Sequence, residues 1–292
     1  MIRPRAAWGF TSPALIAITV VFVVPVIAAL VLSFTDFDIY GIADRHNVRF
    51  VGLDNYRRLL ATPLFWIALR NTAVFVVVGA PLSIAVSLGA AVLLDARVVR
   101  WRGALRTALF APVVTTVVAV ALIWRYIFHT RYGLLNYVLG WFGIHAVDWL
   151  GDPQWSMPAM IVFAVWKNFG SNMIIFVAGL QSIPAELYEA ARLDGAGRAA
   201  QFRYITLPAL APTLLLVTIL TMVGYFQLFA EPYVMTRGGP AQSTTSVLYF
   251  MFEEGFKWWN LGYASAVAFV LFAIMLAGTL AQLALARRWS RP

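Results

Sequence analysis

The chain has 292 residues, of which 61% are hydrophobic and only 12% are charged. Ordinary soluble domains are about half apolar and about a quarter charged, so this composition excludes a soluble globular protein. The modest Gly and Pro content excludes a disordered or fibrous chain. The sequence has no cysteine, which excludes disulfides, thiolate metal sites and a cysteine nucleophile. The net charge of +9 is better explained by the basic loops of a membrane protein than by a nucleic-acid partner.

Long apolar runs dominate the sequence. Six of them are long enough to cross about 30 Å of hydrocarbon as α-helices, and only Lys167 is charged within them. The runs cover residues 13–34, 71–94, 107–124, 157–181, 207–230 and 262–286. We therefore predict an all-α, polytopic membrane protein with six transmembrane helices in a single domain over residues 1–292. The first run is too long for a signal peptide and no small-residue cleavage site follows it, so we expect the mature protein to keep it.

The basic residues predict the orientation of the chain. Arginines are more frequent near both termini and in the loops 97–106 and 192–203 than in the remaining loops. Loops rich in basic residues stay in the cytoplasm, so we expect both termini on the cytoplasmic side. The aromatic-rich stretches 128–155 and 249–259 then lie on the outer side, where they fit interfacial belts or short helices.

Several kinds of chemistry are absent from the sequence. Neither Lys167 nor Lys257 lies in a G-x-x-x-x-G-K-[ST] loop, so the chain is not expected to bind ATP in the P-loop manner. The histidines His46, His129 and His145 are scattered over loops and predict no metal site, and no catalytic dyad is recognisable. None of the six runs contains Asp, Glu or His, which disfavours a proton-driven carrier because a proton relay needs titratable groups in the bilayer. Energy for any transport is expected to come from a partner.

The longest polar segment on the predicted cytoplasmic side covers residues 182–208. Ser182 is suited to cap a helix that ends at Gly195, which supplies a left-handed residue. A second short helix is expected over residues 196–206. Such a helix pair fits a groove on another protein or the membrane surface, and the residues alone leave both alternatives open.

A motif lies within this segment. It consists of Glu189-Ala190-Ala191, Asp194-Gly195-Ala196, Phe202, Ile205, Leu207 and Pro208. It closely resembles the EAA loop of ABC-importer permeases, and in particular the sugar branch that carries maltose, other oligosaccharides and glycerol 3-phosphate. The resemblance continues through residues 50–56, 236–240 and 262–266. It implies the type I ABC-importer permease fold and a binding-protein-dependent transport system component of the bacterial cytoplasmic (inner) membrane.

The resemblance also implies a set of partners. The EAA loop of the family is the coupling helix, which docks on a cytoplasmic ABC ATPase dimer. That dimer binds ATP and Mg, so this chain would need no cofactor and would catalyse no reaction itself. A second homologous permease subunit would complete the pathway within the membrane lipid, and a periplasmic or lipid-anchored substrate-binding protein would deliver the sugar.

Individual residues of the motif receive roles from the same resemblance. The implied coupling residues are Glu186, Glu189, Ala190, Ala191, Asp194, Gly195 and Ala196. Glu189 would make a polar or ionic contact with the ATPase. Ala190 and Ala191 would allow close approach, and Gly195 would set the break between the two helices.

Two of the apolar runs carry polar stripes at helical spacing. The first stripe is Ala164, Lys167, Asn168 and Ser171, and the second is Thr221, Gly224, Tyr225 and Leu228, with Gln227 beside it. A buried charge is expensive, so Lys167 is expected either to face a wet cavity or a partner chain, or to snorkel or pair with a lipid or with an acid such as Glu231. Polar residues also hold transmembrane helices together, and that alternative stays open.

The resemblance to maltose-type permeases implies that these two helices line the sugar cavity. The implied substrate-binding residues are Lys167, Asn168, Ser171, Thr221, Gly224, Tyr225, Gln227 and Leu228. Hydroxyl and amide groups suit a sugar, and Tyr225 offers an aromatic face. In many importers of this class only one of the two permeases holds the sugar, so the site is expected in this chain or in its partner.

The sequence thus predicts a membrane-spanning permease subunit of an ATP-driven ABC importer that translocates a sugar or oligosaccharide by alternating access. The alternative is a secondary carrier for a sugar or another small polar solute. A secondary carrier predicts uptake that an ion gradient drives and that changes at Glu189 do not affect. A membrane-embedded enzyme predicts a catalytic cluster that the sequence lacks.

Overall fold

The computed structural model describes residues 4–95 and 101–289 of the chain. These residues form helices, turns and loops, with one isolated bridge between Thr35 and Phe50, which confirms the all-α prediction. The contacts divide the chain into a first unit, residues 1–66 and 250–274, and a second unit, residues 67–249 and 275–292.

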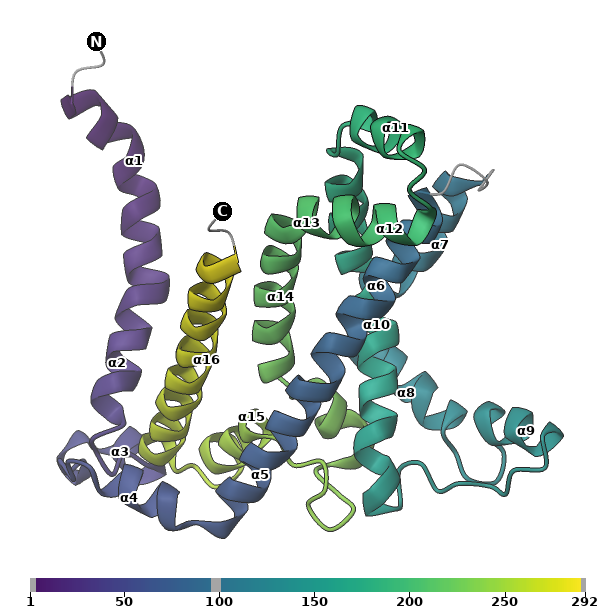
Figure 1. The fold of residues 1–292 in the computed structure, drawn as a ribbon. Coiled ribbons are helices and arrows are strands. Elements are labelled where there is room, and N and C mark those ends of the chain that lie inside the picture. The colour runs from purple at the N-terminus through teal and green to yellow at the C-terminus, as the bar shows by residue number, and fades with distance from the viewer. Residues whose placement is uncertain (1–3, 96–100, 290–292) are drawn as a thin grey trace. The chain divides into compact units, whose positions relative to one another are not determined.

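The α-helices and π-helical turns follow one another along the chain with few long loops (Figure 1). The α-helices are α1 (Pro4–Ile18), α2 (Val24–Leu32), α3 (Ile39–Ala43), α4 (Asp54–Ala61), α5 (Pro63–Val74), α6 (Ala80–Asp95), α7 (Arg102–Val114), α8 (Val117–Ile127), α9 (Leu134–Trp141), α10 (Pro153–Gln181), α11 (Ala185–Leu193), α12 (Arg198–Gln201), α13 (Leu207–Ala209), α14 (Ala211–Phe226), α15 (Val247–Phe252) and α16 (Leu261–Trp289). The π-helical turns are Thr19–Val23, Phe75–Gly79, Phe202–Thr206, Pro232–Thr236 and Glu253–Lys257, and Arg45–Asn47 is a 3₁₀ turn.

The first unit begins with one long apolar helix, in which α1 continues through a π-helical turn into α2. The span Phe10–Leu32 has no buried side chain within the chain, as expected of a helix that faces lipid or another subunit. Asn55 of α4 fixes the end of this helix, since its side-chain amide donates hydrogen bonds to the carbonyls of Ser33 (2.9 Å) and Thr35 (2.8 Å). A buried amide that serves two carbonyls satisfies backbone groups that the helix end leaves open.

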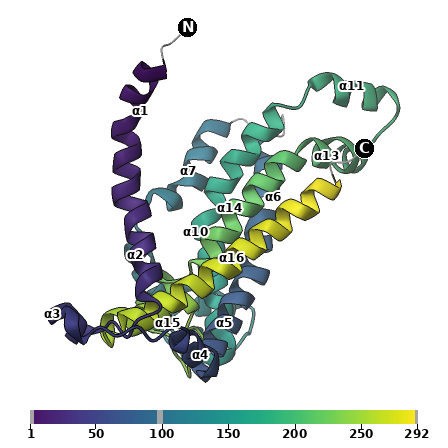
Figure 2. The ribbon, with the colours of Figure 1, turned by 90° about the vertical axis from the view of Figure 1, so that its left-hand side faces the viewer.

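Three helices of the second unit, α6, α10 and α14, lie side by side (Figure 2). One cluster of buried side chains joins them near the start of α10 and includes Phe75, Met160, Phe163 and Tyr225. A second cluster joins them near the end of α10 and includes Leu94, Phe176, Leu180 and Leu210. The two clusters hold the helices that carry both predicted polar stripes.

Four of the six predicted spans are continuous apolar helices among the described residues. They are Phe10–Leu32, Pro63–Asp95, Pro153–Gln181 and Leu261–Ala286. Two further helix pairs pass the same test of length and composition but are sharply bent, so the chain has up to six spans if each bent pair is one.

The predicted span 107–124 is divided into α7 and α8, which are bent by 99°. Thr115 and Thr116 between them are extended, with ψ angles of 150° and 133°. Pro112 cannot donate its backbone nitrogen to the preceding turn, and the Thr115 hydroxyl donates to the Pro112 carbonyl (2.6 Å). The expectation of one straight helix here is therefore wrong, because hydropathy does not register these local signals.

The predicted span 207–230 is divided in the same way. The helix Arg198–Ala209 meets α14 at Leu210 with a bend of 68°. Pro212 cannot donate to the carbonyl of Pro208 one turn earlier, and sharp bends in helices lie at such positions. The apolar run therefore begins in one helix and continues in another.

The aromatic-rich stretches predicted at 128–155 and 249–259 contain short helices. In the first stretch α9 is tied to the loop that follows it by Asn136, whose amide donates to the carbonyls of Thr130 (3.0 Å) and Val147 (2.8 Å). In the second stretch α15 passes into the π-helical turn Glu253–Lys257.

Gly170 of α10 packs directly on the backbone of α7. A Cβ atom at this position would lie 2.5 Å from the carbonyl oxygen of Leu109 and 3.1 Å from the Cα of Phe110. We expect Gly170→Ala to destabilise the protein by about 1–3 kcal/mol, because the backbone on the other side cannot move as a side chain would. Gly89→Ala is the matched control, since a Cβ there meets nothing within 4 Å. Thermal unfolding in detergent measures the difference, and equal midpoints for the two variants would contradict the expectation.

Candidate functional site

The segment that joins α10 to α11 differs from the sequence prediction. The Ser182 hydroxyl donates to the carbonyl of Gly179 (2.7 Å), inside the last turn of α10. Ser182 therefore ends α10, and the prediction that it caps the next helix is wrong. Pro184 precedes α11 instead, with no side-chain cap. The serine hydroxyl bonds to a carbonyl of the helix that it ends, as Ser and Thr side chains often do with nearby backbone groups.

The break after α11 lies at Gly195, as predicted, with φ of 79°. The Gly195 N–H donates to the carbonyl of Arg192 (3.1 Å) and the Ala196 N–H donates to that of Ala191 (2.8 Å). This pair of bonds closes the helix around a left-handed residue, which favours glycine. The second helix begins at Arg198 rather than at residue 196, and it continues past the predicted end to Ala209.

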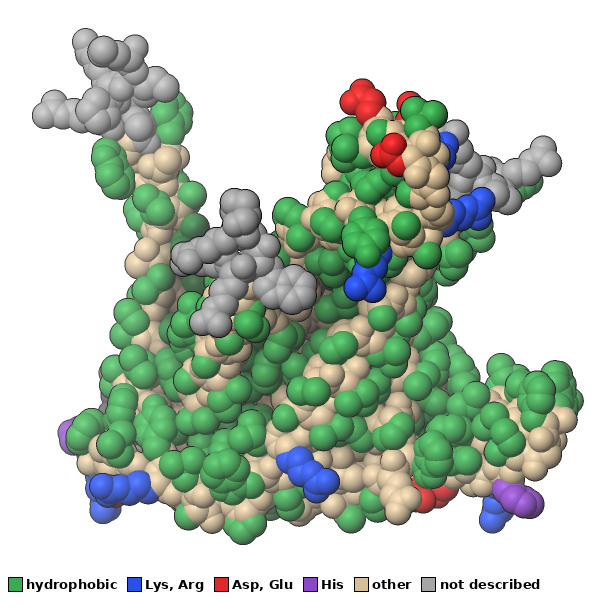
Figure 3. All heavy atoms as spheres, viewed as in Figure 1, with side chains coloured by type: hydrophobic (Ala, Val, Ile, Leu, Met, Phe, Trp, Pro, Cys, Tyr) green, Lys and Arg blue, Asp and Glu red, His purple; other side chains and the backbone are tan. Residues whose placement is uncertain are grey.

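The predicted coupling residues form an exposed surface on α11 and its C-terminal turn. No residue of α11 is buried, and Leu193 is 90% exposed. Figure 3 shows acidic side chains gathered on this element. The exposed residues of the set are Glu186, Glu189, Ala190, Asp194 and Gly195, and the half-buried ones are Ala191 and Ala196. The carboxylate of Glu189 makes no ion pair or hydrogen bond with any described residue, so its charge is free to meet a partner.

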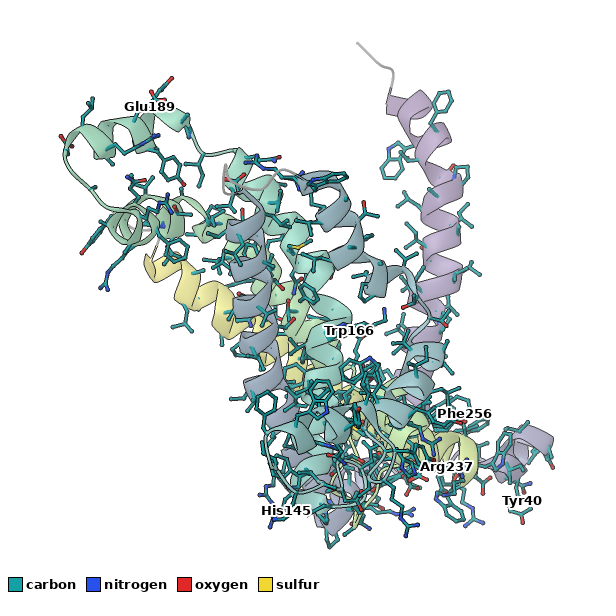
Figure 4. All side chains as sticks on the ribbon, turned by 90° about the vertical axis from the view of Figure 1, so that its right-hand side faces the viewer. Tyr40, His145, Trp166, Glu189, Arg237 and Phe256 are labelled. Atoms are coloured by element: carbon teal, nitrogen blue, oxygen red, sulfur yellow. The ribbon has the colours of Figure 1, made fainter. Side chains whose placement is uncertain are left out.

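The coupling surface and the loops that connect the other ends of the helices lie far apart in the second unit. Figure 4 places Glu189 at one end of the long helices and His145 and Arg237 at the opposite end. A chain that spans a membrane in this way exposes the α11 surface on one side and the loops on the other.

Lys167 lies halfway along α10 and is only 8% exposed. Its ammonium group donates a hydrogen bond to the carbonyl of Val113 (3.1 Å) at the end of α7. The break after α7 leaves this carbonyl without a helical partner, and a cation beside the C-terminus of a helix is favourable. Lys167 thus supplies the hydrogen-bond donor that the Val113 carbonyl lacks where the helix is broken.

The carboxyl group of Glu231 interacts with Lys167 over a distance without forming an ion pair. Burial raises the pKa of Glu231 above its usual range, and the nearby Lys167 ammonium opposes this shift. Among the described residues the ion pairs within 4 Å involve other side chains, so the predicted direct pairing of the two groups is not seen.

The other predicted wall residues divide into accessible and buried groups. Asn168 and Ser171 on α10 are half-buried, and Gly224 and Gln227 are exposed. The buried members are Ala164, Thr221, Tyr225 and Leu228. The Thr221 hydroxyl accepts a hydrogen bond from the Asn172 amide (2.9 Å) across the contact between α10 and α14. Thr221 is therefore already used to hold the two helices together.

Tyr225 sits in a slot built by residues that the sequence analysis did not single out. Tyr225 is 3% exposed, and its ring stacks on Phe75 with ring centroids 5.0 Å apart. Gly79 makes room for the ring, since a Cβ there would lie 2.6 Å from it. The hydroxyl oxygens of Tyr225 and Ser83 are both buried and form no hydrogen bond with any residue that the structure describes.

Comparison with known proteins decides the family. Residues 96–291 match the family described as binding-protein-dependent transport system inner membrane component. The chain belongs to this family. Its members are permease subunits of ABC importers, in which the EAA motif and the coupling helix are typical features.

Curated relatives of this permease are named as sugar transport proteins. The arabinooligosaccharides transport system permease protein AraP of Halalkalibacterium halodurans is 34% identical over 93% of this chain and 84% of its own length. The sulfoquinovosyl glycerol transport system permease protein SmoG of Agrobacterium fabrum is 33% identical over 94% and 88%. The lactose transport system permease protein LacF of Rhizobium radiobacter is 35% identical over 90% and 88%.

The fold of this permease matches a solved ABC importer. A chain of the bacterial ABC transporter involved in the import of the acidic polysaccharide alginate aligns with a TM-score of 0.81 at 22% identity, covering 98% of this chain and 96% of that one. The match confirms the fold of an ABC-importer permease.

Two serines one turn apart on α6 allow a matched test of the unpaired hydroxyls. Ser87 donates to the carbonyls of Ser83 and Phe169, whereas the Ser83 hydroxyl has no partner. We expect Ser87→Ala to destabilise this permease by about 1 kcal/mol, the net value of a hydrogen bond, and Ser83→Ala to be neutral or stabilising because it removes an unsatisfied buried group. Thermal unfolding in detergent measures both, and a larger loss for Ser83→Ala would show that its hydroxyl has a partner.

Proposed function

We propose that this permease is a subunit of an ATP-driven importer that moves a sugar or oligosaccharide across the bacterial inner membrane by alternating access. The observation that carries the proposal is the exposed helix–Gly–helix element with its EAA sequence at one end of helices that bear polar stripes. The relatives named for arabinooligosaccharides, sulfoquinovosyl glycerol and lactose support the substrate class.

The wall residues support a hydroxyl-rich substrate. The accessible polar groups of the two stripes are Asn168, Ser171 and Gln227. The two amides can donate and accept hydrogen bonds, and the Ser171 oxygen can accept them, since its hydrogen is donated to the Asn168 carbonyl. Lys167 carries the one formal charge of these stripes, but it is bound to a backbone carbonyl. We therefore assign Lys167 a structural role in the wall, where it stabilises the break between α7 and α8.

The partners and topology belong to the same proposal. A second homologous permease completes the pathway, a cytoplasmic ATPase dimer holds ATP and Mg and docks on α11, and a periplasmic or lipid-anchored binding protein delivers the sugar. The chain acts as one transmembrane domain over residues 1–292, with both termini in the cytoplasm, and it hydrolyses no ATP itself. The alginate importer, solved in complex with a periplasmic protein that holds an alginate pentasaccharide, is an assembly of this kind.

Transport then depends on the difference in contacts between two states. ATP closes the ATPase dimer, α11 moves with the surface on which it is docked, and the helices that carry the polar stripes open toward the other side. A partner shifts such an equilibrium only by the difference in its affinity for the two states. In this chain, the difference in the ATPase's affinity for the two states arises from its contacts with the docking surface on α11.

Reversal of one charge tests the coupling assignment. Glu189→Lys replaces an exposed carboxylate without a partner in the chain, so the fold is expected to survive. We expect the ATPase dimer to bind at least tenfold more weakly and uptake of an oligosaccharide to be lost, because a like charge then faces the site that the carboxylate recognised.

Co-purification of the ATPase with the tagged permease, together with uptake by cells, measures the effect. Asp54→Lys, at an exposed acid of α4 whose ion pair with Arg57 is exposed, is the control and should leave co-purification unchanged. Normal ATPase binding and uptake by Glu189→Lys would contradict the coupling role and favour a secondary carrier.

Truncation of Lys167 tests the broken span. Lys167→Ala removes the donor to the Val113 carbonyl, so we expect a loss of about 1–3 kcal/mol in stability together with a change in substrate affinity or turnover. Thermal unfolding and substrate-stimulated ATP hydrolysis are measured side by side. Reduced stability with unchanged ATP hydrolysis would show a purely structural lysine.

A further inference from the structure

The two connections of α11 to the helices with polar stripes differ in length and geometry. Only residues 182–184 separate α11 from α10, and Pro184 restricts the backbone there. The other connection, from α11 to α14, contains the left-handed Gly195, the separate helix Arg198–Ala209 and the bend at Leu210. A displacement of α11 therefore reaches α10 through three residues, whereas the backbone path to α14 runs through a turn, a separate helix and a bend.

One side-chain hydrogen bond bypasses most of this longer connection. The hydroxyl of Tyr188 on α11 lies 2.9 Å from the hydroxyl of Thr206, the last residue of the π-helical turn Phe202–Thr206. Thr206 is 6% exposed, and its hydroxyl also contacts the carbonyl of Gln201 (3.4 Å). Within the described part of the chain, no other side-chain hydrogen bond joins α11 to another element.

The bond continues into α14 through the backbone. The carbonyl of Thr206 accepts the N–H of Leu210 (2.9 Å), and the carbonyl of Leu210 accepts the N–H of Leu214 (2.7 Å). Leu210 is fully buried among the side chains of α6 and α10. The hydrogen-bonded path from Tyr188 thus passes through the bend at Leu210 into the helix that carries Tyr225.

We propose that the Tyr188–Thr206 hydrogen bond is a brace that makes α14 follow α11, so that Tyr188 and Thr206 are positioning residues for transport. This inference rests on the proposed coupling of α11 to an ATPase. Tyr188 is half-buried and bound within the chain, and it belongs to none of the residues assigned to the docking surface. Its removal should therefore leave ATPase docking intact and weaken the response of α14.

The chain contains no cysteine, so a single introduced thiol reports on α14. Gly224→Cys is suited to this, since Gly224 is exposed and a Cβ there meets nothing within 4 Å. The experiment uses the complete complex in lipid nanodiscs, with cysteine-free partner subunits, and measures the rate of maleimide labelling with and without ATP and vanadate. This readout needs no knowledge of the sugar.

In the Gly224→Cys background we expect ATP and vanadate to change the labelling rate. Adding Tyr188→Phe or Thr206→Val should reduce that change about fivefold, the factor that corresponds to one net hydrogen bond of about 1 kcal/mol. Thr206→Ser, which keeps the hydroxyl, should restore the response. The double variant Tyr188→Phe/Thr206→Val should be no worse than either single variant, because both remove the same interaction.

Tyr204→Phe is the matched control. Tyr204 lies in the same π-helical turn and is 72% exposed, and its loss should leave the labelling response and ATPase co-purification unchanged. A normal response in Tyr188→Phe would overturn the brace, and so would loss of ATPase binding in that variant, which would place Tyr188 in docking or folding. Failure of the ATPase to bind the parent protein would instead overturn the proposed function.

Discussion

The structure depends on one constraint, which is that backbone N–H and C=O groups in the bilayer must find partners inside the protein. The continuous helices meet it by themselves. The break between α7 and α8 does not, because Pro112 lacks an N–H and Thr115 and Thr116 are extended. The Lys167 ammonium satisfies the freed carbonyl of Val113, which accounts for a charge halfway along a transmembrane helix.

The same constraint explains why the polar stripes serve structure and transport together. Thr221 is engaged by Asn172, and Tyr225 is held between Phe75 and Gly79. Asn168 and Ser171 remain half-buried, and the Ser171 hydroxyl donates to the carbonyl of Asn168 (2.8 Å). A permease that binds a polar solute for a short time needs both kinds of group, since helices that separate on each cycle must find their contacts again when they close.

The parts of this fold that local sequence signals control could be predicted. Continuous spans follow from the length of the apolar runs, and the Gly195 break follows from a left-handed cap. The breaks near Thr115 and Leu210 were missed because a hydropathy reading counts Pro112, Pro212 and β-branched residues as apolar or neutral. Their signals were present in the sequence, but their effect on helix geometry outweighs their hydropathy.

The partners within the wall could not be predicted for a different reason. Which carbonyl meets Lys167 and which ring stacks on Tyr225 depends on how α6, α7, α10 and α14 face each other. Gly79 and Ser83, one turn apart on adjoining helical segments, were the available signal for a close approach, since small residues let transmembrane helices pack tightly. The spacing of Gly79 and Ser83 in the sequence does not show which helix packs against them.

The order of elements along the chain explains why one exposed helix can control the whole wall. α11 lies between α10 and α14 in sequence, and these two helices carry the two polar stripes. A displacement of α11 is therefore applied to both walls, through a three-residue link on one side and through a bent, hinged helix on the other. The three-residue link carries the displacement to the first wall. The hydrogen bond from Tyr188 to Thr206 carries it to the second wall, so that α10 and α14 both respond to the partner bound at α11.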